Sequence, residues 1–151
     1  MWVYADHYRA GEKMRAYIMI MLLLSCTPQA WAQRASAPEQ VEGATRLSAE
    51  QVIALVLRQE PLVIVDSRKG QEYAKGHIEG AVNLPDTVMT RELLHRLTRS
   101  LDTPLLFYCN GVHCLRSSNA AKKAQQWGYR YIYWFRGGWN EWRSKQLPVS
   151  R

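Results

Sequence analysis

Two cysteines and the residues around them form the part of this chain that could carry chemistry. Cys109 follows an apolar run at 104–108, and Cys114 comes five residues later, before a helix-like segment that starts near Ser117. Backbone N–H groups and the positive end of a helix dipole converge at such a junction. Both lower the pKa of a thiol, and the thiolate is its reactive form. The pattern favours Cys109 as an activated nucleophile.

Charged neighbours indicate an anion site beside this thiol. Arg116 can hold an oxyanion through two parallel hydrogen bonds, and a cation at a helix start is unfavourable unless an anion compensates it. His113 is either a donor to the same anion and a proton carrier, or an ordinary loop histidine. The alternative for Cys109 is a buried structural cysteine, which leaves Gly111 and the surrounding charges unexplained.

Cys114 has two interpretations that the sequence leaves open. It is either a resolving thiol that captures Cys109 as a disulfide, or a passive small apolar residue. A bridge across so short a loop would stabilise the fold little, because the entropic effect of a disulfide grows with loop length. The pair is therefore interpreted as chemical rather than structural. Its spacing lacks a second ligand pair, so no metal and no other cofactor is expected.

A second polar group follows another apolar run. Asp66 and Arg68 flank Ser67 directly after residues 62–65. Residues two apart in an extended chain point to the same side. We interpret them as a supporting salt bridge that shapes the neighbouring loop, and His77 as a hydrogen-bonded structural residue.

The elements that must position these residues alternate along the chain. Strands are expected at 62–66, 81–84, 105–108 and 131–135, and helices at 48–59, 71–75, 90–98, 117–127 and 139–144, with a turn at 76–80. Apolar, β-branched runs are typical of parallel strands covered on both faces. The alternation predicts an α/β fold with a central, mostly parallel sheet and helices on both faces. Functional loops lie at the carboxyl ends of such strands, where Cys109 and Asp66 both stand.

The first 32 residues have the pattern of a secretory signal peptide. Arg15 precedes a short apolar core, and Ala30-Trp31-Ala32 forms a cleavage pattern; translation starts at residue 1 or at Met14. The core is far shorter than the roughly 20 residues of a membrane-spanning helix. A secreted, periplasmic protein is expected. The alternative is a bacterial lipobox that ends at Cys26, whose lipidation would anchor the protein to a membrane.

The remaining segments and the charge narrow the class of partner. Residues 33–44 are polar and aperiodic, which predicts a flexible linker before a domain at 45–151. A net charge of +7 suits small anionic substrates. No block of five like charges occurs, so a nucleic-acid partner is not expected.

Three motifs occur in order along the chain. They are Asp66-Ser67-Arg68 with residues 72–85, Cys109 to Arg116-Ser117 with Ala120-Ala121 and Gly128-Tyr129, and residues 135–142 with Leu147-Pro148-Val149. Together they resemble the signatures of rhodanese-like domains over about residues 47–149. The chain is thus similar to single-domain sulfurtransferases and to their three-layer sandwich fold.

The resemblance implies sulfur transfer through a cysteine persulfide. By position Cys109 would take sulfane sulfur from a donor such as thiosulfate, and a thiol acceptor, small or on a protein, would remove it. Arg116 would match the arginine that closes the loop. The residues implied in substrate binding are Asn110, Gly111, Val112, His113, Cys114, Leu115 and Arg116, with the loop amides as the cradle for the sulfur.

The loop departs from the usual family pattern in its length. Single-domain rhodaneses usually have this arginine five residues after the cysteine, whereas Arg116 is seven after Cys109. The loop resembles that of a secreted subgroup with a Cys-Asn-Gly-x-x-Cys sequence, and the natural donor stays open. The alternative functions are a periplasmic thiol–disulfide redox protein using Cys109 and Cys114, a related phosphatase or arsenate-type reductase, and a non-catalytic binding module.

Overall fold

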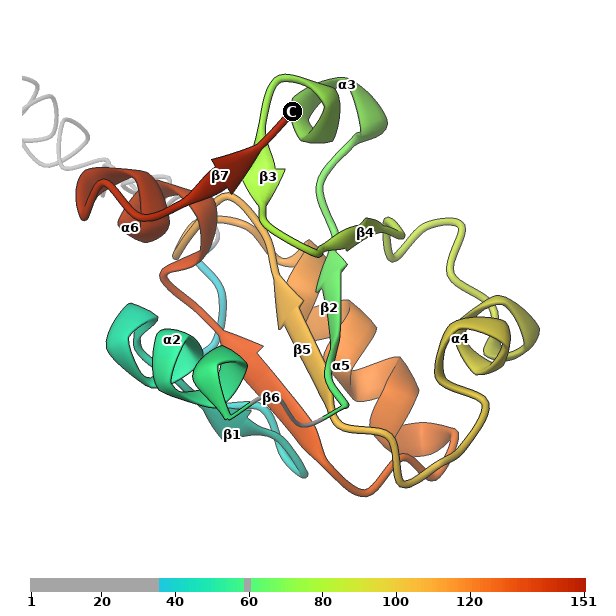
Figure 1. Cartoon of the computed structure of the whole chain (residues 1–151). Helices are drawn as coiled ribbons and strands as arrows, with labels where there is room; N and C mark the ends of the chain where they lie inside the picture. The colour runs from blue at the N-terminus through green and yellow to red at the C-terminus, as the bar shows by residue number, and fades with distance from the viewer. Residues whose placement is uncertain (1–35, 59–60) are drawn as a thin grey trace, which may run out of the picture. The chain divides into compact units, whose positions relative to one another are not determined.

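Five short strands form a parallel sheet in the computed structural model, which describes residues 36–58 and 61–151 (Figure 1). The order across the sheet is β1-β6-β5-β2-β4, and each neighbouring pair is parallel. The strands are β1 (Thr45–Arg46), β2 (Val63–Asp66), β4 (Val82–Asn83), β5 (Leu105–Tyr108) and β6 (Ile132–Phe135). The expected signal peptide at 1–32 lies outside the described residues, as do Met14 and Cys26.

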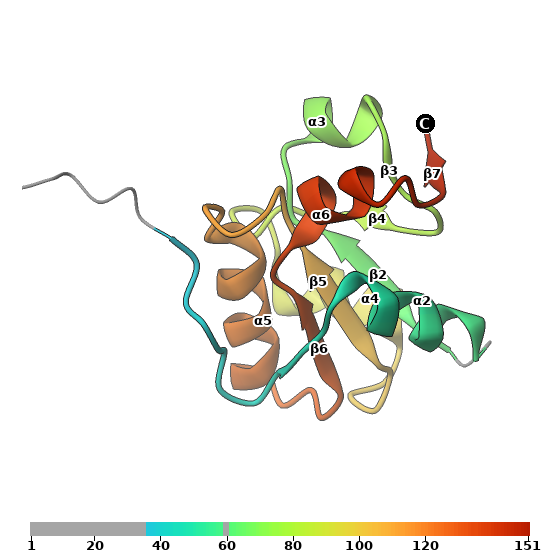
Figure 2. The same cartoon turned by 90° about the vertical axis from the view of Figure 1, so that its left-hand side faces the viewer.

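Helices cover both faces of this sheet (Figures 1 and 2). On one face, α4 (Arg91–Thr98) and α5 (Arg116–Gln126) bury Leu94, Ala120 and Ala124 in a cluster with strand residues. On the other face, α2 (Ala49–Leu57) and α6 (Gly138–Ser144) join a second cluster. Successive strand residues alternate between the two clusters, as Val65 and Phe107 against Ile64 and Leu106 do. The predicted α/β sandwich is confirmed.

The central strands and two helix starts follow directly from local sequence. β2 pairs with β4 and β5, so both of its edges are covered, as its unbroken apolar run predicted. The Ser48 side chain accepts from the Gln51 amide, and the Gln51 side chain accepts in return from the Ser48 amide. Thr90 caps α4 in the same way through the amide of Leu93.

A small second sheet replaces the expected turn at 76–80. β3 (His77–Ile78) pairs antiparallel with β7 (Val149–Ser150), at the same end of the sandwich as α3 (Gly70–Ala74) and α6 (Figure 1). The His77 ring stacks on Tyr73, with centroids 3.8 Å apart, and its Nδ1 lies 3.2 Å from the Tyr73 carbonyl oxygen. The structural role inferred for His77 is confirmed.

Residues 36–44 pack against the sandwich instead of forming a free linker. Ala37 and Val41 are buried in the cluster on the α5 side, and Figure 2 shows the segment running beside α5. The Arg136 guanidinium donates to the carbonyls of Ala37 and Pro38 at 3.0 and 2.8 Å. The linker expectation rested on polar composition and was wrong for these residues. Composition does not reveal that two isolated apolar side chains, Ala37 and Val41, find buried sites on the domain.

The supporting pair Asp66 and Arg68 forms a fully buried salt bridge, as expected. Their closest N···O distance is 2.6 Å, and the Arg68 guanidinium also donates to the Gly76 carbonyl at 2.7 Å. The Trp139 ring covers the guanidinium at 4.5 Å. Burial alone would lower the pKa of Arg68, but the hydrogen bonds and charge of Asp66 raise it above its ordinary value. Arg68 therefore stays charged, and the pair ties the end of β2 to the turn before β3 and to α6.

Tyr108 extends this network to the end of β5. Its hydroxyl donates to Asp66 at 2.6 Å and accepts from the Ile78 amide at 3.2 Å. Burial, with the charge of Asp66 and the hydrogen bond to it, raises the pKa of Tyr108 well above its ordinary value. The residue before Cys109 is thus locked in place by a protonated hydroxyl.

Tyr108→Phe should destabilise the fold by about 1–3 kcal/mol, because a buried carboxylate and a buried amide each lose a partner. Urea unfolding measures the loss. Tyr131→Phe is the control. Tyr131 is 52% exposed, so loss of its hydroxyl should leave the unfolding midpoint unchanged. Equal midpoints for the two variants would contradict the role assigned to Tyr108.

Candidate active site

Cys109 stands at the carboxyl end of β5, next to the end of β2. The strands pair in register so that Tyr108 lies opposite Asp66, and residues 109–115 then connect β5 to α5. Cys109 is 1% exposed, whereas Cys114 is half-buried. The loop therefore buries its first sulfur and leaves its second within reach of solvent.

The amino end of α6 holds the first two loop carbonyls. The Trp139 amide donates to the Cys109 carbonyl and the Asn140 amide to the Asn110 carbonyl, both at 2.8 Å. Gly138 permits this approach, because its φ is +55° and a Cβ there would lie 2.2 Å from the Cys109 carbonyl oxygen. Gly138 is thus needed for contact with the loop and not only for a turn.

The far side of the loop is held by residues 36–44. The Ala37 amide donates to the Val112 carbonyl at 2.7 Å, and within the loop the Cys114 amide donates to the Gly111 carbonyl at 2.9 Å. The other amides of 110–115 donate to no acceptor in the described part of the chain. These contacts support the loop and leave most of its N–H groups available.

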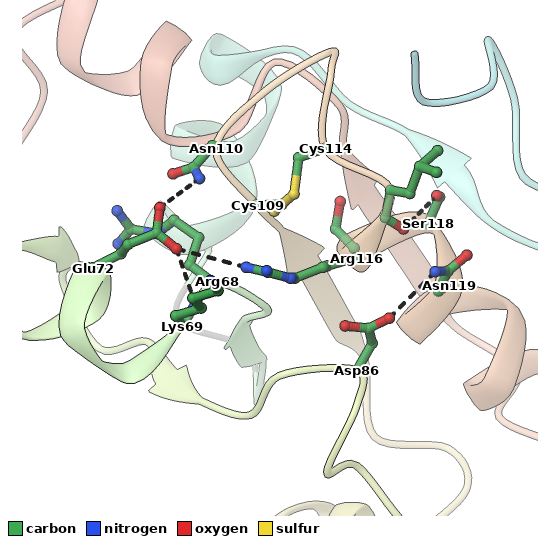
Figure 3. The surroundings of a disulfide bond; sticks show 12 residues. Arg68, Lys69, Glu72, Asp86, Cys109, Asn110, Cys114, Arg116, Ser118 and Asn119 are labelled. Carbon is green, nitrogen blue, oxygen red and sulfur yellow. Dashed lines mark hydrogen bonds and ion pairs between the residues drawn. A yellow bond between two sulfur atoms is a disulfide. The ribbon is translucent and has the colours of Figure 1, made fainter. Parts of the chain in front are cut away.

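Cys109 and Cys114 form a disulfide, with Cα atoms 6.2 Å apart (Figure 3). Cys114 is therefore bonded to Cys109, and its role as a resolving thiol stays a prediction. Neither sulfur is a thiolate in this oxidised state, so nucleophilic chemistry at Cys109 first requires reduction of the bond.

Arg116 begins α5 and extends toward α3 (Figure 3). Its guanidinium lies 3.6 Å from the Glu72 carboxylate, and the other Glu72 oxygen accepts from the Asn110 side chain at 2.7 Å. The anion partner that Arg116 was expected to need is, in this structure, a carboxylate of the chain itself.

Glu72 was not singled out as a site residue by the sequence analysis. Partial burial by itself would raise the pKa of Glu72, but the hydrogen bonds from Asn110 and the Lys69 amide and the charge of Arg116 lower it. The carboxylate therefore stays charged at neutral pH. Glu72 follows β2, whose carboxyl end lies at the same sheet edge as Cys109, and this position could have predicted that Glu72 lies near the loop.

Asp86 is a second acidic neighbour that sequence reasoning missed. It is 7% exposed, and one oxygen accepts from the Asn119 side chain at 3.2 Å while the other has no partner among the described residues (Figure 3). Lys123 donates to its backbone carbonyl at 2.6 Å. These bonds join the segment after β4 to α5, so Asp86 helps to position that helix.

Residues 110–114 of the predicted set line a pocket of about 260 Å³, which we call the loop pocket, and Leu115 and Arg116 do not line it. It is lined by Asn110, Gly111, Val112, His113, Cys114, Gly137, Asn140 and Glu141. His113, Val112 and Leu115 are exposed, and His113 makes no hydrogen bond within the described residues. The loop pocket reaches Cys114 and is not lined by Cys109.

Across residues 36–58 and 61–151, no three His, Cys, Asp or Glu side chains are grouped so that they could hold a metal ion. Within the same ranges, every helix is too short or too polar to cross a bilayer.

Comparison with known proteins identifies relatives of this chain. The sequence profile of the family described as "Rhodanese-like domain" matches residues 48–145. The thiosulfate sulfurtransferase GlpE of Pseudomonas entomophila is 39% identical over 99 residues, which cover 66% of this chain and 84% of that protein. An uncharacterized protein of Buchnera aphidicola is 28% identical over 95 residues, which cover 63% of each chain, so the match spans less than two thirds of that relative.

Solved structures share the fold. The crystal structure of the BH2092 protein of Bacillus halodurans has a TM-score of 0.62 to this chain at 27% identity, and the match covers 71% of this chain and 77% of that one. The sandwich, its sheet and its covering helices are thus an arrangement already seen by experiment.

Gly138→Ala should destabilise the fold by about 1–3 kcal/mol more than Gly80→Ala, as measured by urea unfolding. Both glycines have positive φ, so both variants carry the same kind of backbone cost. Only at Gly138 does the added methyl group meet the Cys109 carbonyl, whereas nothing lies within 4 Å of the corresponding position at Gly80. Equal losses would show that α6 does not approach the loop as closely as described.

Proposed function

Since the chain belongs to the rhodanese-like domain family, we propose that it is a sulfurtransferase that moves sulfane sulfur from an anionic donor such as thiosulfate to a thiol acceptor. The observation that supports this most is the position of Cys109 at the start of a loop with unpaired amides at the end of a central strand. The similarity to GlpE over most of the domain supports the same activity.

The first step forms a persulfide on Cys109. The Cys109 thiolate attacks the outer sulfur of thiosulfate, the sulfur–sulfur bond of the donor breaks, and sulfite leaves with the electron pair. The loop N–H groups and the amino end of α5, an 11-residue helix, favour the anion that starts and ends this step.

The second step returns the enzyme to its thiolate. An acceptor thiolate attacks the outer sulfur of the persulfide, and Cys109 leaves as the anion it was before. The loop pocket, lined by residues 110–114 and by Gly137, Asn140 and Glu141, brings a small thiol or the cysteine of an acceptor protein to the loop, next to Cys114.

Arg116 binds the anionic donor in competition with Glu72, which already pairs with its guanidinium. The guanidinium is an anion site by charge and geometry, but the Glu72 carboxylate lies 3.6 Å from it and repels a dianion. The pair therefore sets how strongly an anionic donor binds, and it favours donors of lower charge over thiosulfate.

A second candidate function is supported by the disulfide. A bond between Cys109 and Cys114, with the Cys114 side half-exposed, is what a thiol–disulfide redox protein would present to its substrates. In that case the reduced chain would exchange electrons with partner thiols and take up no sulfur from thiosulfate.

We also propose that the protein acts outside the cytoplasm. The signal-peptide pattern of residues 1–32 supports secretion to the periplasm, and a disulfide persists in such an oxidising compartment. Lipidation at Cys26 is the alternative form, which would hold the same domain at a membrane surface. Small anions and thiols are the proposed partners, with no nucleic acid among them.

Cys109→Ser should abolish sulfur uptake, because the oxygen of serine is not nucleophilic toward sulfane sulfur under these conditions. Each variant is reduced, freed of reductant and given thiosulfate with cyanide as acceptor, and thiocyanate is measured. We expect a loss of at least about a thousandfold for Cys109→Ser, whereas Cys114→Ser should still release sulfite from thiosulfate. Activity that survives in Cys109→Ser and disappears in Cys114→Ser would show that the nucleophile is Cys114.

Glu72→Gln should lower the KM for thiosulfate by roughly two- to fivefold, because it removes the negative charge that neutralises Arg116. Glutamine can still accept the hydrogen bond from Asn110. Glu42→Gln, at an exposed position, makes the same change in net charge and should leave the KM unchanged. The gain should shrink in 1 M salt; a KM that rises in Glu72→Gln would contradict the competition.

A further inference from the structure

The disulfide joins two sulfur atoms with different access to solvent. Cys109 is 1% exposed at the base of the loop, and Cys114 is half-buried and lines the loop pocket. Figure 3 shows Cys114 above Cys109, with the Arg116 side chain running below the bond toward Glu72. A reagent that enters through the loop pocket therefore meets Cys114, while the sulfur of Cys109 faces the interior and Cys114.

Contacts outside the disulfide hold the two cysteines at this spacing. The Trp139 amide of α6 donates to the Cys109 carbonyl, and the Cys114 amide donates to the Gly111 carbonyl within the loop. Between the two cysteines, the Val112 carbonyl accepts from the Ala37 amide. Because these bonds do not involve sulfur, they persist when the disulfide is reduced. Cys114 then stays beside Cys109, at a high effective concentration.

We propose that Cys114 resolves the Cys109 persulfide, so that the transferred sulfur leaves as hydrosulfide and not only as a persulfide on an acceptor. This inference rests on the proposed function, since it starts from the Cys109 persulfide. The Cys114 sulfur attacks the inner sulfur of the persulfide, on the Cys109 side chain. The bond between inner and outer sulfur breaks, and the proton of Cys114 leaves with the outer sulfur as HS⁻.

The electrons of this step balance within the protein. The sulfane sulfur is reduced to hydrosulfide, and the two cysteine sulfurs are oxidised to the disulfide that the structure contains. Which of the two persulfide sulfurs is attacked decides the outcome. A free thiol that attacks the outer sulfur carries it away, whereas Cys114, which is bonded to Cys109 in the oxidised structure, is the thiol positioned beside the buried inner one.

Reduction of the disulfide closes the cycle and requires an external dithiol. Its thiolate attacks the accessible sulfur, that of Cys114, and Cys109 leaves as a thiolate favoured by the loop amides and α5. The second thiol of the reductant then releases Cys114. The net reaction converts a sulfane donor and a dithiol into hydrosulfide and a disulfide, which makes the protein a sulfane-sulfur reductase as well as a transferase.

A single-turnover experiment tests the release step. The full chain is reduced, freed of reductant without air, and mixed with one equivalent of thiosulfate; sulfite, bimane-trapped hydrosulfide and intact mass are then measured. The wild type should yield one sulfite and one hydrosulfide per chain and should lose two hydrogens by forming the disulfide. Cys114→Ser should yield sulfite, keep one extra sulfur, and release at least about tenfold less hydrosulfide.

Each other outcome has a definite meaning. If the wild type keeps the extra sulfur and releases no hydrosulfide, the release step is wrong and the proposed transfer stands. If neither form releases sulfite nor gains sulfur, the proposed function fails, and the release step fails with it. Cys114→Ala should behave as Cys114→Ser does; hydrosulfide release from both, with unfolding midpoints near that of the wild type, would overturn the role of Cys114.

Discussion

The geometry of this site depends on the close approach of α6 to the backbone of Cys109. A helix can donate its first amides to the loop carbonyls only if no side chain stands between them, and Gly138 satisfies that requirement. The same helix places Trp139 over the buried guanidinium of Arg68, which in turn pairs with Asp66 and through it with Tyr108. The residue before Cys109 and the residue after it are thus fixed by one connected set of contacts.

Electrostatics at the site are balanced within the chain. Arg116 brings a positive charge to the amino end of α5, where the helix dipole disfavours it. The carboxylate of Glu72 compensates for the charge of Arg116 and for the positive end of the dipole. Asn110 links that carboxylate to the loop, so charge and loop conformation are coupled. In the proposed function, a donor anion has to compete with this anchored carboxylate for Arg116.

The lengthened loop accommodates a second sulfur without losing its support. Residues 36–44 hold its outer part, α6 holds its inner part, and the disulfide lies between them. Cys109 is buried and Cys114 is half-buried, so the two cysteines differ in their access to solvent. The proposed mechanism assigns sulfur uptake to Cys109 and exchange with solvent thiols to Cys114.

The sequence by itself determined the alternation of strands and helices, the family resemblance and the position of Cys109 at a strand end, because hydrophobic period and capping residues act locally. The caps at Ser48 and Thr90 and the apolar run before Asp66 are examples. Only the tertiary structure decided that Glu72 pairs with Arg116, that residues 36–44 pack against the domain, and which sulfur is buried. Those features join residues far apart in the chain, and composition and periodicity contain no information about which distant groups meet.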